Sequence, residues 1–227
     1  MENNIILQAE DLVKTYGQGN QKIYALDHVS LSIHKGEFIA VTGESGSGKT
    51  TLLNVLGSLD TPDSGSIRFQ GEELVGQNDL RLSAYRRRSI GFIFQYYNLI
   101  PVLNVEENIV LPMNLDSTAP DMDYLAELLE MIGLTSKRQS FPHELSGGQQ
   151  QRIAFARALI HKPPLILADE PTGNLDSKNS REIIAILKNS IRKYHQTLIL
   201  ITHDGSIAAQ ADRIFTMHDG VLNEIGG

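Results

Sequence analysis

Residues 43–50 read Gly43-Glu44-Ser45-Gly46-Ser47-Gly48-Lys49-Thr50 and are the most informative segment of the chain. It matches G-x-x-x-x-G-K-[ST], the pattern of a loop that binds nucleotide phosphates. Glycines let successive backbone N–H groups converge on phosphate oxygens, because no side chain obstructs the approach. The pattern predicts that Lys49 bridges the β- and γ-phosphates and that the Thr50 hydroxyl is a ligand of Mg²⁺.

The segments on either side of this loop suit a phosphate site. Residues 38–41 are a short apolar run, which predicts a fully buried strand. After the loop, apolar residues recur at helical spacing on one face, namely Leu52, Val55, Leu56 and Leu59. The N-terminus of that helix adds partial positive charge. This context favours nucleotide binding over the alternative, a glycine-rich turn without a ligand.

The rest of the chain extends the strand-and-helix pattern. Two more apolar runs, residues 165–167 and 198–201, enclose an amphipathic helix marked by Ile184, Leu187 and Ile191. Buried strand, helix and buried strand in succession are typical of a parallel sheet covered by helices. We therefore expect an α/β core.

Three other segments add to this core. Alternating apolar residues at 29–33 predict a half-buried strand in an early antiparallel portion. Residues 104–160 are mostly helical, with one helix that begins near Asp121 and ends before Gly133. Residues 213–222 predict a hairpin.

The composition excludes several classes of protein. The 227 residues carry 20 basic and 27 acidic side chains, and a net charge of −7 argues against nucleic acid as a partner. No cysteine is present, which excludes disulfide scaffolds, thiolate metal sites and cysteine nucleophiles. The seven scattered histidines lack ligand spacing, so no structural metal held by the protein is expected. Without an apolar run of roughly 18 residues or a signal peptide, we expect a cytoplasmic protein.

Two adjacent carboxylates follow the buried run at 165–167. Asp169 is predicted to hold Mg²⁺ through water, and Glu170 to orient and deprotonate an attacking water molecule. The alternative is a pair of acidic residues that merely ends a strand at the solvent edge. The phosphate loop favours the catalytic interpretation.

Residues 145–149 read Leu-Ser-Gly-Gly-Gln and precede a helical pattern. Bare N–H groups at a helix start would form a second anion site. The pentapeptide resembles the signature motif of the ATP-binding-cassette (ABC) ATPases. That resemblance implies that two copies dimerise head to tail, with each signature motif gripping the γ-phosphate of the ATP held by the other copy.

Other motifs of this family follow in its order. Gln95 resembles the glutamine of the loop that senses Mg²⁺ and touches the membrane partner, and residues 174–176 resemble the D-loop. His203 resembles the switch histidine, on the sheet edge where ligands bind. Tyr16 lies where the family has its adenine-stacking aromatic residue. The alternatives are a structural histidine and an ordinary surface aromatic.

The resemblance thus implies a full set of site residues with ATP and Mg²⁺. The catalytic residues would be Glu170, His203 and Gln95, and the metal-binding residues Thr50, Gln95 and Asp169. The nucleotide-binding residues would be Tyr16, Gly43, Ser45, Gly46, Ser47, Gly48, Lys49, Thr50, Thr51, Ser146, Gly147, Gly148, Gln149 and Asp176.

The resemblance covers essentially the whole chain. It implies an α/β P-loop NTPase with a RecA-like parallel-sheet core, an antiparallel β subdomain and a helical insertion. We expect a single ABC ATPase domain over residues 1–227. The core and the β subdomain would take about 1–95 and 160–227, and the helical subdomain about 96–159.

Residues 57–60, 91–95 and 170–177 look most like one subgroup of the family, the MacB-, LolD- and FtsE-like proteins. This resemblance implies an ATPase that drives a separate integral membrane permease from the inner face of the membrane. Export or mechanotransmission of macrolide, antimicrobial peptide or lipoprotein type would be its purpose. The apolar loop at 96–100 and the neighbouring helices are the expected docking surface.

Two other functions remain open. A regulatory ATPase of cell-division or peptide-sensing type would switch a membrane protein without moving cargo. A soluble member acting on DNA or ribosomes fits poorly, because such relatives carry long coiled-coil insertions or two cassettes. The arginines at 86–88 are expected to form a solvated face, with contact to a partner's cytoplasmic segment as the alternative.

Overall fold

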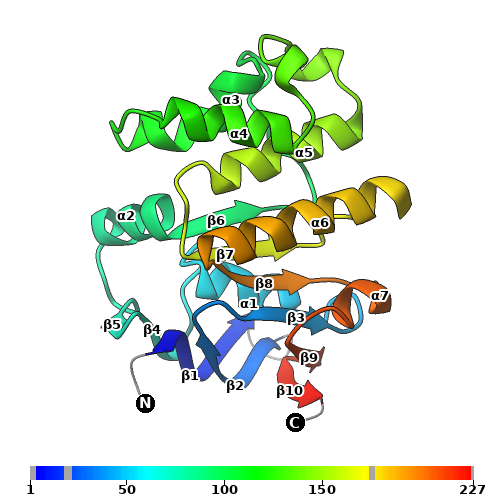
Figure 1. The fold of residues 1–227 in the computed structure, drawn as a ribbon. Helices are drawn as coiled ribbons and strands as arrows, with labels where there is room; N and C mark the ends of the chain where they lie inside the picture. The colour runs from blue at the N-terminus through cyan, green and yellow to red at the C-terminus, as the bar shows by residue number, and fades with distance from the viewer. Residues whose placement is uncertain (1–3, 18–21, 174–176, 226–227) are drawn as a thin grey trace.

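The structure is a computed structural model that describes residues 4–17, 22–173 and 177–225. Two sheets and a set of helices form layers (Figure 1). The six-stranded sheet has the order β10-β9-β3-β8-β7-β6. Its strands are β3 (Phe38–Thr42), β6 (Ile90–Ile93), β7 (Leu165–Asp169), β8 (Thr197–Ile201), β9 (Arg213–His218) and β10 (Val221–Ile225).

The pairing in this sheet is parallel except at one edge. β3 pairs in parallel with β8 and β9, β7 with β8, and β6 with β7. β10 is antiparallel to β9, and the turn between them has positive φ at Asp219 and Gly220. The predicted βαβ core and the predicted hairpin are therefore confirmed.

Alternating side chains of the central strands enter two separate cores. On β7, Leu165 and Leu167 pack with helix α1 (Lys49–Leu56) and the second sheet. Ile166 and Ala168 point the other way, toward the helices that cover the opposite face. Strands buried on both faces account for the continuous apolar runs in the sequence.

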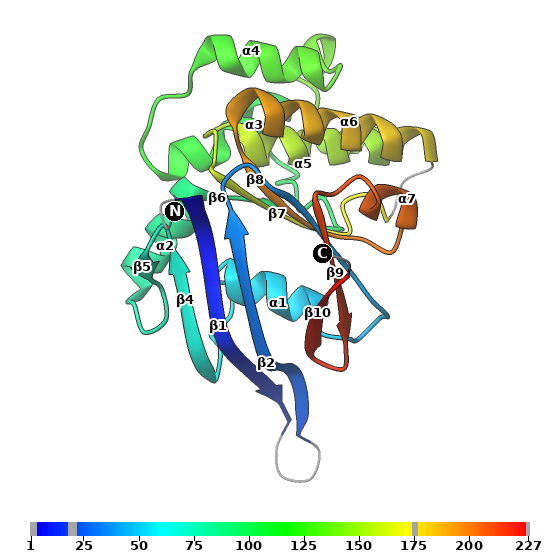
Figure 2. The same ribbon diagram turned by 60° about the horizontal axis from the view of Figure 1, so that its bottom comes forward.

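The second sheet is antiparallel, with the order β2-β1-β4-β5. Figure 2 shows α1 lying between this sheet and the parallel one. Its strands are β1 (Ile5–Tyr16), β2 (Ile23–His34), β4 (Ser64–Phe69) and β5 (Glu72–Glu73). The early antiparallel portion is confirmed, but β1 was not identified from the sequence. Register shifts along β1 and a positive φ at Asp11 interrupt the alternation that would have marked it.

The helices of the middle segment share a core with the outer face of the parallel sheet, the last of them packing against β6 and the other two lying beyond it (Figure 1). They are α3 (Val105–Leu115), α4 (Met122–Met131) and α5 (Gly147–Leu159), followed along the chain by α6 (Ser177–Tyr194) and α7 (Gly205–Ala208). Asn104, Asp121 and Ser146 cap the first three of these helices through their side chains. Among the described residues, no helix combines the length and hydropathy needed to cross a bilayer.

The three arginines lie on α2 (Asp79–Ser89), and they bind partners within the chain. Arg86 donates to the Ser58 carbonyl at 2.8 Å, while Arg87 and Arg88 both bind the Asp116 carboxylate, at 3.2 and 2.9 Å. Only Arg88 is fully exposed. The expectation of a solvated face is therefore wrong for Arg86 and Arg87, which tie α2 to the ends of α1 and α3.

Candidate nucleotide-binding site

The glycines of the phosphate loop allow it to pass between β9 and β2. A Cβ on Gly43 would lie 2.2 Å from the Met217 carbonyl oxygen, and one on Gly48 would lie 2.1 Å from the Ala25 carbonyl oxygen. Both residues also have positive φ, at 142° and 108°. A Cβ on Gly46 would meet open space instead. The loop thus packs against the backbone at both of its ends, while its middle is open to a ligand.

Lys49 closes the loop into a ring. Its ammonium donates to the carbonyl oxygens of Gly43 at 2.8 Å and Glu44 at 2.6 Å, and the side chain is buried. Helix α1 begins at this residue, and its N-cap Gly48 offers no side-chain cap. N–H groups at an uncapped helix start attract anions.

A cavity of about 520 Å³ opens over this loop. That volume lies within the usual range for small-molecule sites. The cavity brings together residues that are far apart in the sequence, from β1, β2, the phosphate loop, the segment after β6 and the end of β7. They are Tyr16, Ile23, Ala25, Ser45, Gly46, Gly48, Lys49, Thr50, Thr51, Gln95, Asp169 and Glu170.

Asp169 ends β7 beside the phosphate loop. Burial raises the pKa of its carboxyl, and the negative charge of Glu170 acts in the same direction, while a hydrogen bond from Thr50 opposes them. A bound cation would relieve the cost of this buried charge. A carboxylate, a hydroxyl and the nearby Gln95 amide are oxygen donors of the kind that Mg²⁺ prefers, so the residues present fit that ion.

Glu170 has a backbone conformation that non-glycine residues rarely adopt, with φ at 42°. Its N–H donates to the Ile201 carbonyl at 3.1 Å, and its carbonyl accepts from Gly173 at 3.0 Å, closing a tight turn. This turn places the Glu170 carboxylate 3.3 Å from His203 Nδ1. The two groups therefore converge at the carboxyl ends of neighbouring strands, as the sequence predicted.

The segment after Gln95 is held by a residue that the sequence did not identify. Arg157 on α5 donates to the backbone carbonyls of Tyr97 and Asn98, at 2.8 and 2.7 Å. Burial lowers the pKa of this guanidinium. No motif marks Arg157, because its partners are carbonyls about 60 positions away, which any residue type could supply.

The signature segment lies outside the cavity of its own chain. Ser146 is exposed and caps α5 by accepting from Gln149 N–H at 3.3 Å, while Gln149 Oε1 accepts from Ser146 N–H at 2.9 Å. Gly147 at the helix start is exposed as well. The N–H groups at this helix start were expected to be bare, but that of Gln149 already donates to the Ser146 side chain. The exposed helix start lies outside the cavity that contains Lys49.

A buried glutamine links this helix to the turn that follows Glu170. Gln151 on α5 donates to the Pro171 carbonyl at 2.7 Å, directly after Glu170. Its Oε1 is also buried and has no hydrogen-bond partner among the described residues. The run of three glutamines at 149–151 was a signal for such a role, but the sequence does not show which of them faces inward.

Four other residues were predicted to bind the nucleotide, and three of them lie in the part of the chain that the structure describes. Thr51 and Tyr16 line the cavity, and Ser47 is buried within the loop. Asp176 lies outside the described residues.

Comparison with known proteins supports this geometry. The ABC transporter family model matches residues 26–173. The chain is 43% identical over 234 residues to the lipoprotein-releasing system ATP-binding protein LolD 2 of Chlorobaculum tepidum, covering 100% of this chain and 95% of that protein. It is 45% identical over 218 residues to the macrolide export ATP-binding/permease protein MacB of the same organism. That match covers 96% of this chain but 33% of MacB, so the chain spans about a third of that relative.

A solved structure is similar over nearly the same length. The ATP-binding cassette MJ0796, seen as a dimer in a post-hydrolysis state bound to ADP and Pi, superposes with a TM-score of 0.88 and 39% identity. The match covers 97% of this chain and 99% of that one. This chain therefore belongs to the ABC transporter family, as an ATP-binding subunit of the LolD and MacB type that hydrolyses ATP.

Proposed function

We propose that two copies of this chain close around two ATP molecules and so drive a separate integral membrane permease, for export or mechanotransmission. Similarity over almost the full length of a lipoprotein-releasing ATP-binding protein supports this function. Residues 1–227 would act as one ATPase domain at the inner face of the membrane, with the helical subdomain at about 96–159. The cargo would be bound by the permease.

Within one copy, the phosphate loop would hold the nucleotide. Lys49 and the N–H groups at the start of α1 would contact the phosphates, and Thr50, Asp169 and Gln95 would hold Mg²⁺. When bound, Mg²⁺ neutralises charge on the phosphate oxygens. Glu170 would orient the attacking water and take its proton, while His203, 3.3 Å from that carboxylate, would contact the γ-phosphate.

The position of the signature segment is the observation that supports a head-to-tail dimer. Ser146 and Gly147 are exposed and lie outside the cavity of their own chain. A second copy in head-to-tail orientation would present this helix start to the γ-phosphate. The similar cassette MJ0796 is dimeric.

Substitution of Ser146 tests this arrangement. In a Glu170→Gln background, which should retain ATP, we expect a dimer by light scattering. Adding Ser146→Arg should leave a monomer that still binds ATP, because the bulky cation would stand at the interface. Ser136→Arg, which adds the same charge at another exposed position, is the matched control. An ATP-induced dimer in the Ser146→Arg protein would contradict the proposal.

The surface next to Gln95 supports a membrane partner. Tyr96, Ile100 and Val102 expose 72%, 39% and 79% of their surface. We expect the permease's cytoplasmic segment to pack on these side chains, because clustered exposed apolar residues favour protein contacts. A tagged protein purified from gently solubilised membranes should retain one permease, and Tyr96→Ser with Val102→Ser should lose it. Val221→Ser, on β10, is the control, and equal permease recovery from both proteins would refute the docking surface.

A regulatory ATPase that switches its partner without moving cargo would use the same site. The reconstituted complex separates the two functions. Hydrolysis stimulated by cargo supports transport, and full stimulation by the permease alone supports regulation.

A further inference from the structure

Tyr16 ends β1 at the mouth of the phosphate cavity, and its ring is held by its edge. The residue is 46% exposed, and its hydroxyl donates to the Asp60 carboxylate at 2.7 Å. A flat π face next to the phosphate loop is suited to stack on a nucleotide base. The phosphate-loop motif does not involve Asp60, and the site proposed above gives it no role.

The Asp60 carboxylate accepts three hydrogen bonds at once. Besides Tyr16, the Lys14 ammonium and the Thr61 N–H each donate to it at 2.7 Å. Lys14 also donates to the Thr61 carbonyl at 2.7 Å and lies 5.4 Å from the centre of the Tyr16 ring. The tyrosine hydroxyl is therefore bound to a carboxylate that cannot turn away without breaking other charged hydrogen bonds.

The loop that carries Asp60 is itself fixed to the helix of the phosphate loop. The N–H groups of Leu59 and Asp60 donate to the Asn54 carbonyl on α1, at 2.8 and 3.2 Å. Helix α1 begins at Lys49. One short rigid path thus connects the phosphate-binding end of the site to the Tyr16 ring.

The charges of this cluster agree with its hydrogen bonds. Partial burial acts to raise the pKa of Asp60, but the bonds from Lys14, Tyr16 and Thr61 bring it below its ordinary value. Burial and the Asp60 carboxylate both raise the pKa of Tyr16. At neutral pH the carboxylate is therefore ionised and the tyrosine keeps the proton that it donates.

We propose that Asp60 is a positioning residue for the nucleotide base, because it fixes the Tyr16 ring at the cavity mouth before the nucleotide arrives. This inference rests on the proposed function only in taking the cavity as the ATP site. A ring that is already ordered loses less conformational entropy when the base stacks on it. Loss of the Asp60 side chain should therefore weaken the contribution of the base to nucleotide affinity and leave the contribution of the phosphates unchanged.

Calorimetric titration with Mg·ATP and with Mg·tripolyphosphate, which has no base, tests this division. Asp60→Ala should weaken ATP binding about 3- to 10-fold, the cost of ordering one free side chain. Tyr16→Phe, which keeps the ring but loses the anchor, should weaken it by a similar factor. The double variant should be no weaker than Tyr16→Phe alone, since that variant has already lost the contact with Asp60 and, in addition, the hydrogen bond of the hydroxyl with Thr51. Tripolyphosphate binding should be unchanged, and hydrolysis should show a raised KM at nearly constant kcat.

Asp63→Ala is the matched control. Asp63 lies in the same loop and binds the residue next to Tyr16, accepting from the N–H and hydroxyl of Thr15 at 2.8 and 2.6 Å. An equal loss of ATP affinity in Asp63→Ala would show that loop anchoring in general matters and would overturn the proposal. So would an equal loss of tripolyphosphate binding in Asp60→Ala.

Tyr16→Ala separates this inference from the site on which it rests. Stacking on an aromatic ring contributes enough that its removal should weaken ATP binding about 10-fold or more. If Tyr16→Ala weakens ATP binding and Asp60→Ala does not, the positioning role fails and the ATP site stands. If Tyr16→Ala also binds ATP like the unaltered protein, the base lies elsewhere, and both the stacking site and the inference fail.

Discussion

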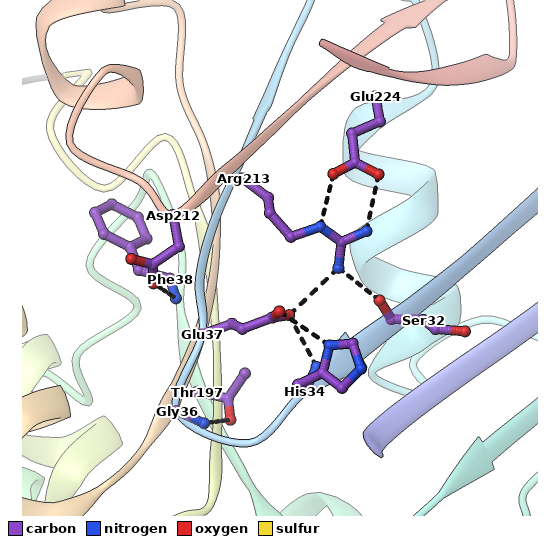
Figure 3. Close-up of polar contacts among 9 residues, drawn as sticks. All are labelled: Ser32, His34, Gly36, Glu37, Phe38, Thr197, Asp212, Arg213 and Glu224. Atoms are coloured by element: carbon purple, nitrogen blue, oxygen red, sulfur yellow. Dashed lines mark hydrogen bonds and ion pairs between the residues drawn. The ribbon is translucent and has the colours of Figure 1, made fainter. Parts of the chain in front are cut away.

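Charged side chains at the amino ends of the parallel strands are paired with one another to a greater extent than those at the carboxyl ends. At the amino end, the polar groups are joined to one another (Figure 3). Arg213 binds both oxygens of Glu224, at 2.7 and 2.9 Å, and also donates to the Ser32 carbonyl at 2.8 Å. Glu37 accepts from the His34 N–H at 2.8 Å and lies 3.4 Å from Arg213. The hydrogen bonds of this network are satisfied within the chain.

At the carboxyl end of the same sheet, charged groups are partly buried, exposed or held in an unfavourable backbone conformation. Asp169 is partly buried with a raised pKa, and Glu170 is held at a positive φ. His203 has 68% of its side chain exposed. The two ends thus differ in that the ion pairs at the amino end are satisfied within the chain, whereas burial opposes the charge of Asp169 at the carboxyl end, and a bound cation would relieve that cost. Four substitutions test this difference between the two ends of the sheet.

Glu170→Gln should have the largest effect. Removing the proposed base should lower kcat for ATP hydrolysis by about 10³-fold, within the range for general bases, and leave ATP bound. A single-turnover assay with a phosphate sensor measures the rate. Turnover close to that of the unaltered protein would remove Glu170 from the mechanism.

Asp169→Asn should separate activity from stability. Hydrolysis should fall at least about 100-fold, because a carboxylate that would hold Mg²⁺ is lost. The melting temperature without ligand should nevertheless rise, because burial opposes the charge on Asp169 and an amide of the same shape removes it. Thermal unfolding with and without Mg·ATP measures both effects. A fall in the ligand-free melting temperature would show that Asp169 is satisfied within the chain, and the contrast between the two ends would fail.

Arg213→Met, at the amino end of the sheet, should lower stability and leave activity unchanged. Loss of its charged hydrogen bonds should lower the free energy of unfolding by about 1–3 kcal/mol, with KM for ATP unchanged. Urea unfolding measures the first quantity and a steady-state assay the second. Arg192→Met, an exposed arginine on α6, is the control. A raised KM in Arg213→Met without any loss of stability would contradict a purely structural role.

Glu224 should give the smallest effect, visible through pH. The hydrogen bond from Arg213 lowers the pKa of Glu224 below its ordinary value of 4.5. The ion pair therefore contributes stability above about pH 4.5, and that contribution is lost as the pH falls through the lowered pKa in the folded protein. The pair is partly exposed to solvent, so its contribution at neutral pH should be at most about 1 kcal/mol.

Unfolding curves of the unaltered protein and of Glu224→Gln between pH 3 and 7 should converge at the acid end. Glu130→Gln, an exposed carboxylate on α4, should follow the unaltered protein throughout. A difference between the unaltered protein and Glu224→Gln that grows as the pH falls would reverse the expected sign.

The parts of this protein that could be predicted from its sequence are those with local causes. The phosphate loop, the strands ending at Thr42 and Asp169, the hairpin at 213–222 and the helix that begins after Ser146 each follow from neighbouring residues, although the cap on that helix was not predicted. Strand β1 was not identified, because its irregular register depends on partners in β2 and β4. Gln151 and Arg157 carry no motif, since their partners are backbone carbonyls from distant segments.

The local elements of this protein were therefore predictable from its sequence: the phosphate loop, the two carboxylates at a strand end and the glycine-rich start of a second helix. Which of these groups lie in contact depends on the folded chain. It placed Asp60 against Tyr16, Gln151 against Pro171 and Arg213 against Glu224. Loop glycines and strand periodicity are patterns of residues that are neighbours in the sequence. A hydrogen bond between distant segments instead depends on where the folded chain brings its two partners.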